Sequence, residues 1–143
     1  MVSKVLAEDA IVVAASASHA LFRQKAKVSL KDLTRYRWAL QPPGAPTRDW
    51  LDHTFDRRRL PRPDVQVEST MLLMLPALIA ETGLLSFISR HHLSGKRGAP
   101  LREIPLEEAT MRRRMVVSYR EGGFLAPAAE RLVALLEQAG DLE

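Results

Sequence analysis

Apolar residues in this chain occur in short runs separated by polar turns, and most of these runs have the length and composition of strands. Ala10–Ala15 is continuous and rich in β-branched residues, which predicts a buried strand. The pattern predicts three more short strands, at Arg37–Gln41, Val65–Glu68 and Leu84–Ser89, and a longer strand at Met111–Glu121.

Two helices are expected between these strands. Because proline is favoured in a first helical turn, one helix should begin near Pro46. Ser69 or Thr70 is expected to cap a second helix that runs to about Thr82. Pro76 lies inside that segment and predicts a kink or a late start, because a proline nitrogen has no hydrogen to donate.

The C-terminal segment predicts a last helix that opens at Pro127, with Leu132, Leu135 and Leu136 forming its buried stripe. Ser29 should cap a single helical turn earlier in the chain. The alternation of strands and helices implies an α/β fold with a largely parallel sheet.

Composition narrows the classes of protein that this chain can be. It contains no cysteine, which excludes disulfides, thiolate metal sites and cysteine nucleophiles. No apolar stretch approaches the roughly 18 residues of a membrane helix, and the apolar run after Asp9 is too short for a signal peptide. We therefore expect a cytoplasmic protein that has no contact with a membrane.

The net charge of +4 comes largely from two arginine runs, 57–59 and 112–114. A basic chain invites a nucleic-acid interpretation, in which affinity would fall steeply with salt. The runs lie far apart and have no aromatic platform near them, so a solvated helix end and a solvated strand face are favoured.

The familiar catalytic and nucleotide-binding motifs are absent. There is no G-x-S-x-G elbow, no G-x-x-x-x-G-K-[ST] loop and no G-x-G-x-x-G. His91 and His92 are adjacent and so point in different directions, which disfavours a shared metal. We predict no enzyme, no cofactor and no metal site.

Binding chemistry remains at two predicted strand-to-helix junctions. Gly44 to Thr47 joins a strand end to a helix start, where backbone N–H groups and the helix dipole favour an anion. Ser69-Thr70 repeats this arrangement at the next junction, and ligands of open α/β sheets bind beyond the carboxyl ends of strands. The alternative is that both junctions are ordinary caps and turns.

An ordered series of segments resembles the effector-binding domain of LysR-type transcriptional regulators. The strand "AIVVAAS", the His19 loop and "VSLKDL" come first. "YRWALQPPGAPTRDWLDHTF" is similar to the family's strand, glycine turn and helix, and "VQVESTMLLMLPALIAETGLLSFISRHHL" to its next strand, helix and strand. "PLREIPL" and the C-terminal strand and helix complete a match over residues 5–138.

The resemblance implies a periplasmic-binding-protein-like fold of two α/β subdomains. Residues 34–110 would form a near-complete second subdomain, and 5–33 with 111–143 would be a remnant of the first. The family's helix-turn-helix has no counterpart in the printed residues, so this chain alone is not expected to bind DNA specifically. The implied partners are a small-molecule effector, with carboxylates and aromatic acids as candidates, and further copies of the chain in a homo-oligomer.

The resemblance also implies which residues line the effector wall of the second subdomain: Gly44, Ala45, Pro46, Thr47, Ser69, Thr70, Thr82, Gly83, Leu84 and Leu85. The implied function is effector sensing in a LysR-type regulator. The alternative is a degenerate fragment that acts only as an oligomerisation or interaction module, because a partial domain exposes apolar surface.

Overall fold

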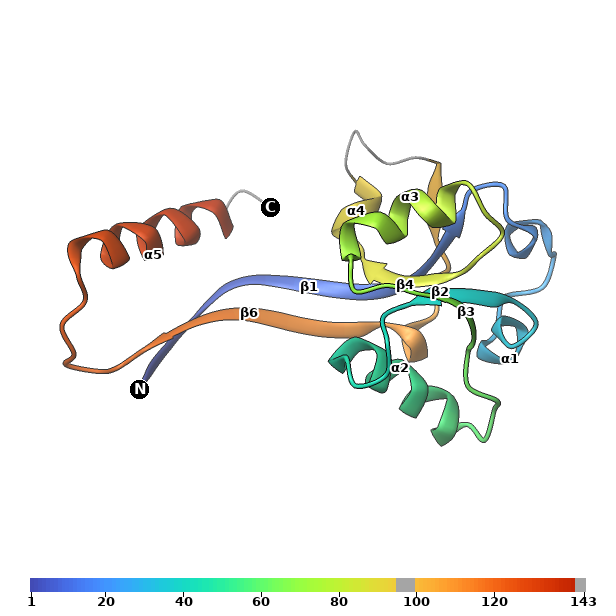
Figure 1. Ribbon diagram of the computed structural model, residues 1–143, viewed down its shortest axis with the longest axis horizontal. Helices are drawn as coiled ribbons and strands as arrows, with labels where there is room; N and C mark the ends of the chain where they lie inside the picture. The colour runs from blue at the N-terminus through green and yellow to red at the C-terminus, as the bar shows by residue number, and fades with distance from the viewer. Residues whose placement is uncertain (95–99, 141–143) are drawn as a thin grey trace. The chain divides into compact units, whose positions relative to one another are not determined.

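The computed structural model describes residues 1–94 and 100–140 and divides the chain into two compact units (Figure 1). The larger unit is Ala10–Met111, and the smaller is Met1–Asp9 together with Arg112–Glu143. Residues 10–33, expected to belong with the C-terminal segment, pack in the larger unit. Among the described residues, no helix has both the length and the apolar composition that crossing a membrane requires.

The sheet of the larger unit is mixed, which corrects the prediction of a largely parallel sheet. β1 (Val2–Ser16) pairs antiparallel with β4 (Ser86–Ser89) and with β5 (Leu101–Glu103). β2 (Arg37–Leu40) and β3 (Asp64–Glu68) pair in parallel. Strand–helix alternation fixes direction only for strands joined by crossover helices, and β1 reaches β2 through shorter helical turns instead.

A parallel bridge joins the two sets of strands. The N–H of Ala39 donates to the carbonyl of Leu85 at 2.8 Å, and the N–H of Leu85 donates to the carbonyl of Arg37 at 2.9 Å. The residue before β4 therefore continues the sheet beside β2. The spatial order is β3, β2, β4, β1, β5, with β1 running against its neighbours.

Alternate residues of these strands are buried on opposite faces of the sheet. Trp38 and Leu40 pack toward α2 (Pro46–Arg57), against Leu51 and Phe55. Ala39, between them, packs on the other face against Leu75 and Ile79 of α3 (Leu75–Ala80). Because side chains of a strand point alternately up and down, one sheet supports two cores.

The structure confirms some of the predicted helix starts and caps and not others. Ser29 caps α1 (Leu30–Leu33) as expected: its hydroxyl accepts from the N–H of Asp32, and Asp32 accepts from the N–H of Ser29 at 2.9 Å. α2 begins at Pro46, as predicted. Short 3-10 turns also form at η1 (Ala20–Arg23) and η3 (Glu107–Ala109), and α4 (His91–Ser94) is a single turn.

The helix after β3 starts late, as Pro76 predicted, but Ser69 and Thr70 do not cap it. A 3-10 turn, η2 (Leu72–Met74), comes before α3. The Ser69 hydroxyl accepts from the N–H of Met71 at 3.0 Å, so it stabilises the turn that leaves β3.

The smaller unit contains the start of β1, all of β6 (Met111–Tyr119) except its first residue, and α5 (Pro127–Gly140). β6 pairs with β1. Lys4 and Glu137 form an ion pair at 2.8 Å. The expected buried stripe of α5 is wrong: Leu132, Leu135 and Leu136 are 56%, 46% and 41% exposed. Within the described residues of this unit, the start of β1 and β6 are too few strands to cover the apolar face of α5.

Truncating Phe55 should unfold the larger unit more easily than truncating an exposed residue of similar type. Phe55 is fully buried and stands edge-on to Trp38 with ring centroids 6.2 Å apart. We expect Phe55→Ala to lower the free energy of unfolding by about 3–5 kcal/mol in urea titrations followed by tryptophan fluorescence. Leu73→Ala, at a residue 82% exposed, should change it by less than about 0.5 kcal/mol. Equal losses in both variants would contradict this assignment of the core.

Candidate functional site

The carboxyl ends of β2 and β3 meet at one edge of the sheet, which we call the carboxyl edge and define as residues 41–48 and 68–70. The N–H of Ser69 donates to the carbonyl of Leu40 at 3.0 Å, which holds the two strand ends together. This edge brings the predicted residues Gly44 to Thr47 close to Ser69 and Thr70. It matches the general position of ligands in open α/β sheets.

The other predicted group, Thr82 to Leu85, lies at the opposite end of the strands. Leu85 is bridged to Trp38 near the start of β2, whereas Gly44 and Ser69 follow the ends of their strands. The structure therefore separates the ten predicted residues into two groups at two edges. We call the second region the amino edge and define it as residues 16–20, 35–37, 66–67 and 78–85.

The glycine turn of the carboxyl edge is already in contact with a carboxylate of this chain. Gly44 has a φ of 90°, a conformation that glycine adopts without strain. Its N–H donates to Oδ1 of Asp49 at 3.0 Å, and the N–H of Ala45 donates to the carbonyl of Pro42 at 3.3 Å. The first turn of α2 has no side-chain cap, so its positive end stays available. The geometry suits an anion, but Asp49 occupies the glycine amide.

A buried arginine ties this turn to both strands. Arg48 is 8% exposed, and its Nε donates to both carboxylate oxygens of Asp52 at 3.1 Å. Its Nη1 donates to the carbonyl of Gln41 at 3.0 Å and lies 3.7 Å from Glu68. The Thr47 hydroxyl donates to the side-chain oxygen of Gln41. Arg48 is thus neutralised internally and positions the edge.

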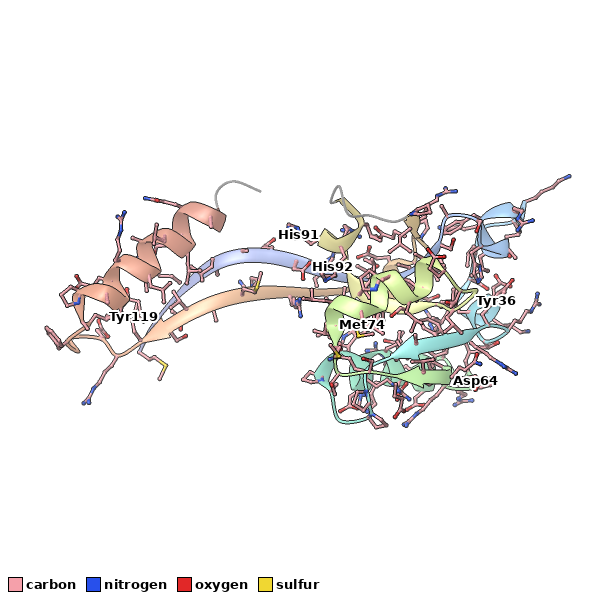
Figure 2. The ribbon with its side chains drawn as sticks, turned by 45° about the horizontal axis from the view of Figure 1, so that its top comes forward. Tyr36, Asp64, Met74, His91, His92 and Tyr119 are labelled. Atoms are coloured by element: carbon pink, nitrogen blue, oxygen red, sulfur yellow. The ribbon has the colours of Figure 1, made fainter. Side chains whose placement is uncertain are left out.

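An apolar segment continues the carboxyl edge after Thr70. Four consecutive large side chains, Met71 to Met74, are all exposed, and Met74 is labelled in Figure 2. We call this segment the apolar lip. Exposed contiguous apolar side chains mark binding surfaces more often than structural ones, and methionine adapts to varied ligand shapes.

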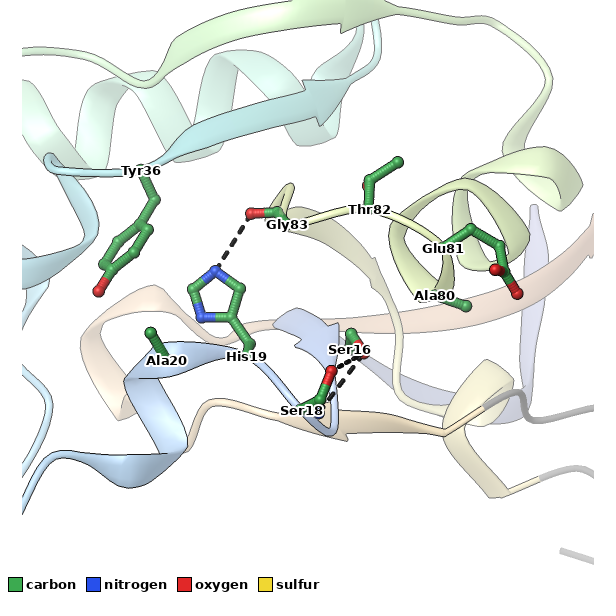
Figure 3. Close-up of a pocket in the computed structure, with 9 residues that line it drawn as sticks. All are labelled: Ser16, Ser18, His19, Ala20, Tyr36, Ala80, Glu81, Thr82 and Gly83. Carbon is green, nitrogen blue, oxygen red and sulfur yellow. Dashed lines mark hydrogen bonds between the residues drawn. The ribbon is translucent and has the colours of Figure 1, made fainter.

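At the amino edge, a buried histidine holds the loop before β4 (Figure 3). Nε2 of His19 lies 3.1 Å from the carbonyl of Gly83, and Nδ1 lies 3.1 Å from the N–H of Leu21. Since an amide can only donate, Nδ1 must accept, so the proton sits on Nε2 and is donated to Gly83. The ring also contacts Tyr36 edge-on, with centroids 4.7 Å apart.

The electrostatics at His19 favour its neutral form. Burial lowers the pKa of His19, and the nearby charge of Arg23 lowers it further, while the hydrogen bond to Gly83 opposes both. His19 lay in a loop that the sequence singled out by resemblance, but nothing in the sequence indicated its contact with a residue 64 positions away.

Two adjoining hollows lie at the amino edge. The first, of about 500 Å³, is lined by Ser16, Ser18, His19, Glu81, Thr82 and Gly83, among others. The second, of about 580 Å³, is bounded by the start of β2, the middle of β3 and the end of α3. Tyr36, Thr82 and Gly83 line both hollows. Leu84 lines the second, and Leu85 is fully buried.

The two arginine runs and His91 occupy exposed positions, as expected for solvated residues, whereas His92 is half-buried. α2 ends at Arg57, and Arg58, which follows it, pairs with Glu108 at 2.8 Å. Arg113 of β6 pairs with Asp9 at 2.7 Å. His91 begins the short α4. Across the described ranges, no group of three or more His, Cys, Asp or Glu side chains is placed to hold a metal ion.

Comparison with known proteins decides the family. The model of the LysR substrate binding domain matches residues 1–141. The chain belongs to this family. It is therefore a domain of the kind found in LysR-type transcriptional regulators and not an enzyme, as its residues predicted.

Curated relatives are longer than this chain. The HTH-type transcriptional regulator GalR of Pseudomonas putida is 30% identical over 139 residues, which cover 96% of this chain and 34% of that protein. The regulator CbbR of Xanthobacter flavus is 25% identical over 140 residues, covering 96% of this chain and 42% of CbbR. This LysR-family chain thus spans about a third to two fifths of their length.

Solved structures confirm the periplasmic-binding-protein-like α/β fold. The regulatory domain of CcmR from Synechocystis PCC6803, in complex with 2-PG, matches with a TM-score of 0.79 and 21% identity over 97% of this chain and 66% of that one. The effector-binding domain of QuiR, in complex with shikimate, matches with a TM-score of 0.73 and 14% identity, covering 99% and 66%.

Acid should weaken the larger unit through His19. Because burial holds the folded pKa below the ordinary value of 6.5, the unfolded chain takes up the proton first. The free energy of unfolding should therefore be independent of His19 above about pH 6.5 and fall as the pH drops below it. His19→Gln keeps a donor for Gly83 but should lose this dependence, whereas Tyr36→Phe should keep it. Identical slopes against pH in the wild type and His19→Gln would refute the assignment.

Removing Arg48 should leave a buried carboxylate without its cation. The side chains of Arg48 and Asp52 are each 9% exposed, so we expect Arg48→Met to lower the free energy of unfolding by about 3 kcal/mol or more in urea. Arg48→Met combined with Asp52→Leu should recover part of this loss. Arg62→Met, which breaks the exposed pair with Asp56, serves as the control and should have little effect. A loss in Arg48→Met no larger than that in the control would count against a structural role.

Proposed function

We propose that this chain is the effector-sensing domain of a LysR-type transcriptional regulator and that it binds a small molecule at the carboxyl edge. The observation that carries the proposal is the meeting of two predicted junctions, Gly44–Thr47 and Ser69–Thr70, at the ends of neighbouring parallel strands. Both present backbone groups near a helical turn. Arg48 and Gln41 hold the first junction in place.

The effector proposed here is a small acid with an apolar part. CcmR and QuiR are described with 2-phosphoglycolate and shikimate, both of which carry acidic groups. The uncapped first turn of α2 favours negative charge, and the apolar lip offers a surface for a hydrocarbon part. An entering carboxylate would take the place of Asp49 on the amide of Gly44.

In a complete regulator, such a ligand would act by stabilising one arrangement of the domain over another. Only a difference in affinity between two arrangements shifts their populations, so the bound acid must contact more than one wall of its site. The regulator would form homo-oligomers and act on DNA in the cytoplasm. These properties concern the whole protein, and membership of the LysR family supports them.

A second candidate function is an oligomerisation or interaction module that binds no effector. The exposed apolar side chains of α5 and of the apolar lip favour it, because monomeric proteins rarely expose large apolar patches. Light scattering across a wide concentration range tests it directly. A monomer at every concentration would exclude self-association, and a defined oligomer that binds none of the acids would favour this function over sensing.

Titration with acids followed by nuclear magnetic resonance tests the proposed effector site. With 2-phosphoglycolate or shikimate added to the ¹⁵N-labelled chain, the amide signals of Gly44, Ala45, Thr47, Ser69 and Thr70 should shift and saturate. Signals of exposed residues remote from this edge, such as Lys25 and Arg59, should not move. The absence of any saturable shift at the carboxyl edge with either acid would argue against the site.

Removing the internal carboxylate should strengthen binding of the acid. Asp49→Ala frees the amide of Gly44, and we expect 2-phosphoglycolate to bind about tenfold more tightly, the equivalent of one charge-assisted hydrogen bond. Asp56→Ala removes the same charge from the exposed side of α2 and serves as the matched control. If the two variants bind 2-phosphoglycolate equally well, Asp49 does not compete for the site.

A further inference from the structure

The second hollow of the amino edge has no role in the proposed effector site. The carboxyl edge lies at the other end of β2, and three steps along a strand separate Arg37 from Leu40 by about 10 Å. Thr82, Gly83 and Leu84, which the sequence marked as ligand-facing, line this hollow instead. The hollow therefore needs an explanation of its own.

Positive charge gathers at the hollow with little internal compensation. Arg35 and Arg37 both line it and both are exposed. Within the described residues Arg35 forms no close ion pair, and its charge reaches Asp32 only at longer range. Arg37 has one acidic neighbour, Asp64, at 3.9 Å, and these two side chains are 65% and 73% exposed. An exposed ion pair of this kind contributes little to stability. Both guanidinium groups can therefore donate hydrogen bonds to an external anion.

The floor of the hollow is apolar and comes from β3, α3 and the loop before β4. Val67 of β3 and Leu78 of α3 are partly buried against the core on the α3 face of the sheet, and Leu84 belongs to that core. A ligand that spans from the arginines to this floor would combine one charged contact with one apolar contact. Most small-molecule sites have this composition.

The loop that lines the hollow at Thr82–Leu84 is fixed by hydrogen bonds. The Thr82 hydroxyl donates to the carbonyl of Leu78 at 2.9 Å and accepts from the N–H of Leu84 at 3.3 Å. His19 holds the carbonyl of Gly83 from the other side, as Figure 3 shows. The loop therefore needs little reordering to bind a ligand, which keeps the entropic cost low.

We propose that this hollow is a second small-molecule site, which takes a monocarboxylate with a planar or branched apolar body. The carboxylate lies between Arg35 and Arg37, and the apolar body packs on Val67, Leu78 and Leu84. Glu81 lines the adjoining hollow, so charge repulsion directs the acid away from it and toward the arginines. This site does not depend on the effector site at the carboxyl edge.

Benzoate is a suitable probe because it carries one carboxylate on one apolar ring. In titrations of the ¹⁵N-labelled chain, it should produce saturable shifts at the amides of Gln66, Val67, Thr82, Gly83 and Leu84. Benzamide has the same shape without the charge and should bind at least about fivefold more weakly. Shifts confined to Gly44 and Ser69, no saturable shift in the millimolar range, or equal binding of benzamide would each overturn the proposal.

A double substitution tests the two arginines. Arg35→Gln with Arg37→Gln keeps the side-chain length but removes both charges, and benzoate should then bind about tenfold more weakly. Lys25→Gln with Lys27→Gln removes the same charge from exposed positions outside the hollow and should leave the affinity unchanged. Unchanged dispersion of the amide spectra shows that each variant is folded. An equal loss of benzoate affinity in both double variants would mean that only the net charge of the chain matters. That result would overturn the proposed site.

Discussion

The larger unit depends on the alternation of side chains along β2 and its neighbours. Trp38 and Leu40 are buried on one face of the sheet and Ala39 on the other, so a four-residue strand anchors two separate cores. A shift of one residue in register would exchange these faces and place the tryptophan under α3, where small and aliphatic residues now pack. The Trp38–Leu85 bridge fixes that register and so fixes where each strand ends.

The positions of the strand ends, in turn, determine where polar backbone and side-chain groups lie together. The parallel run of β2 and β3 brings their carboxyl ends together, and with them the junctions at Gly44 and Ser69. The same directions place the start of β2 beside the loop before β4, which His19 holds. A single topological choice therefore produces two opposite edges with different chemistry. One has a helix start and an apolar lip, and the other has arginines above an apolar floor.

Local patterns in the sequence predicted local structure well. Pro46 indicated the start of α2, Ser29 indicated the capped turn α1, and Pro76 indicated the late start of α3. Each of these residues acts on the backbone within a few positions of itself. Properties that depend on distant contacts were not predictable. The direction of β1, the exposure of Leu135 on α5 and the contact between His19 and Gly83 are set by which elements meet in space. The candidate site was limited in the same way: the strand-to-helix pattern pointed to Gly44–Thr47 and Ser69–Thr70 and the family resemblance to Thr82–Leu85, but neither indicated that the sheet separates them.

In the proposed effector site, the contact between Asp49 and Gly44 would set the concentration range over which the domain responds. A tethered carboxylate never diffuses away, so any external acid must compete with it at a fixed local concentration. If the amide were free only a tenth of the time, the apparent dissociation constant would rise about tenfold without any change in the contacts of the bound state. Substitution at this one position would then shift the response threshold while leaving the ligand's chemistry alone. Related regulators could in this way be adjusted to abundant or scarce metabolites by a residue that the bound ligand never touches.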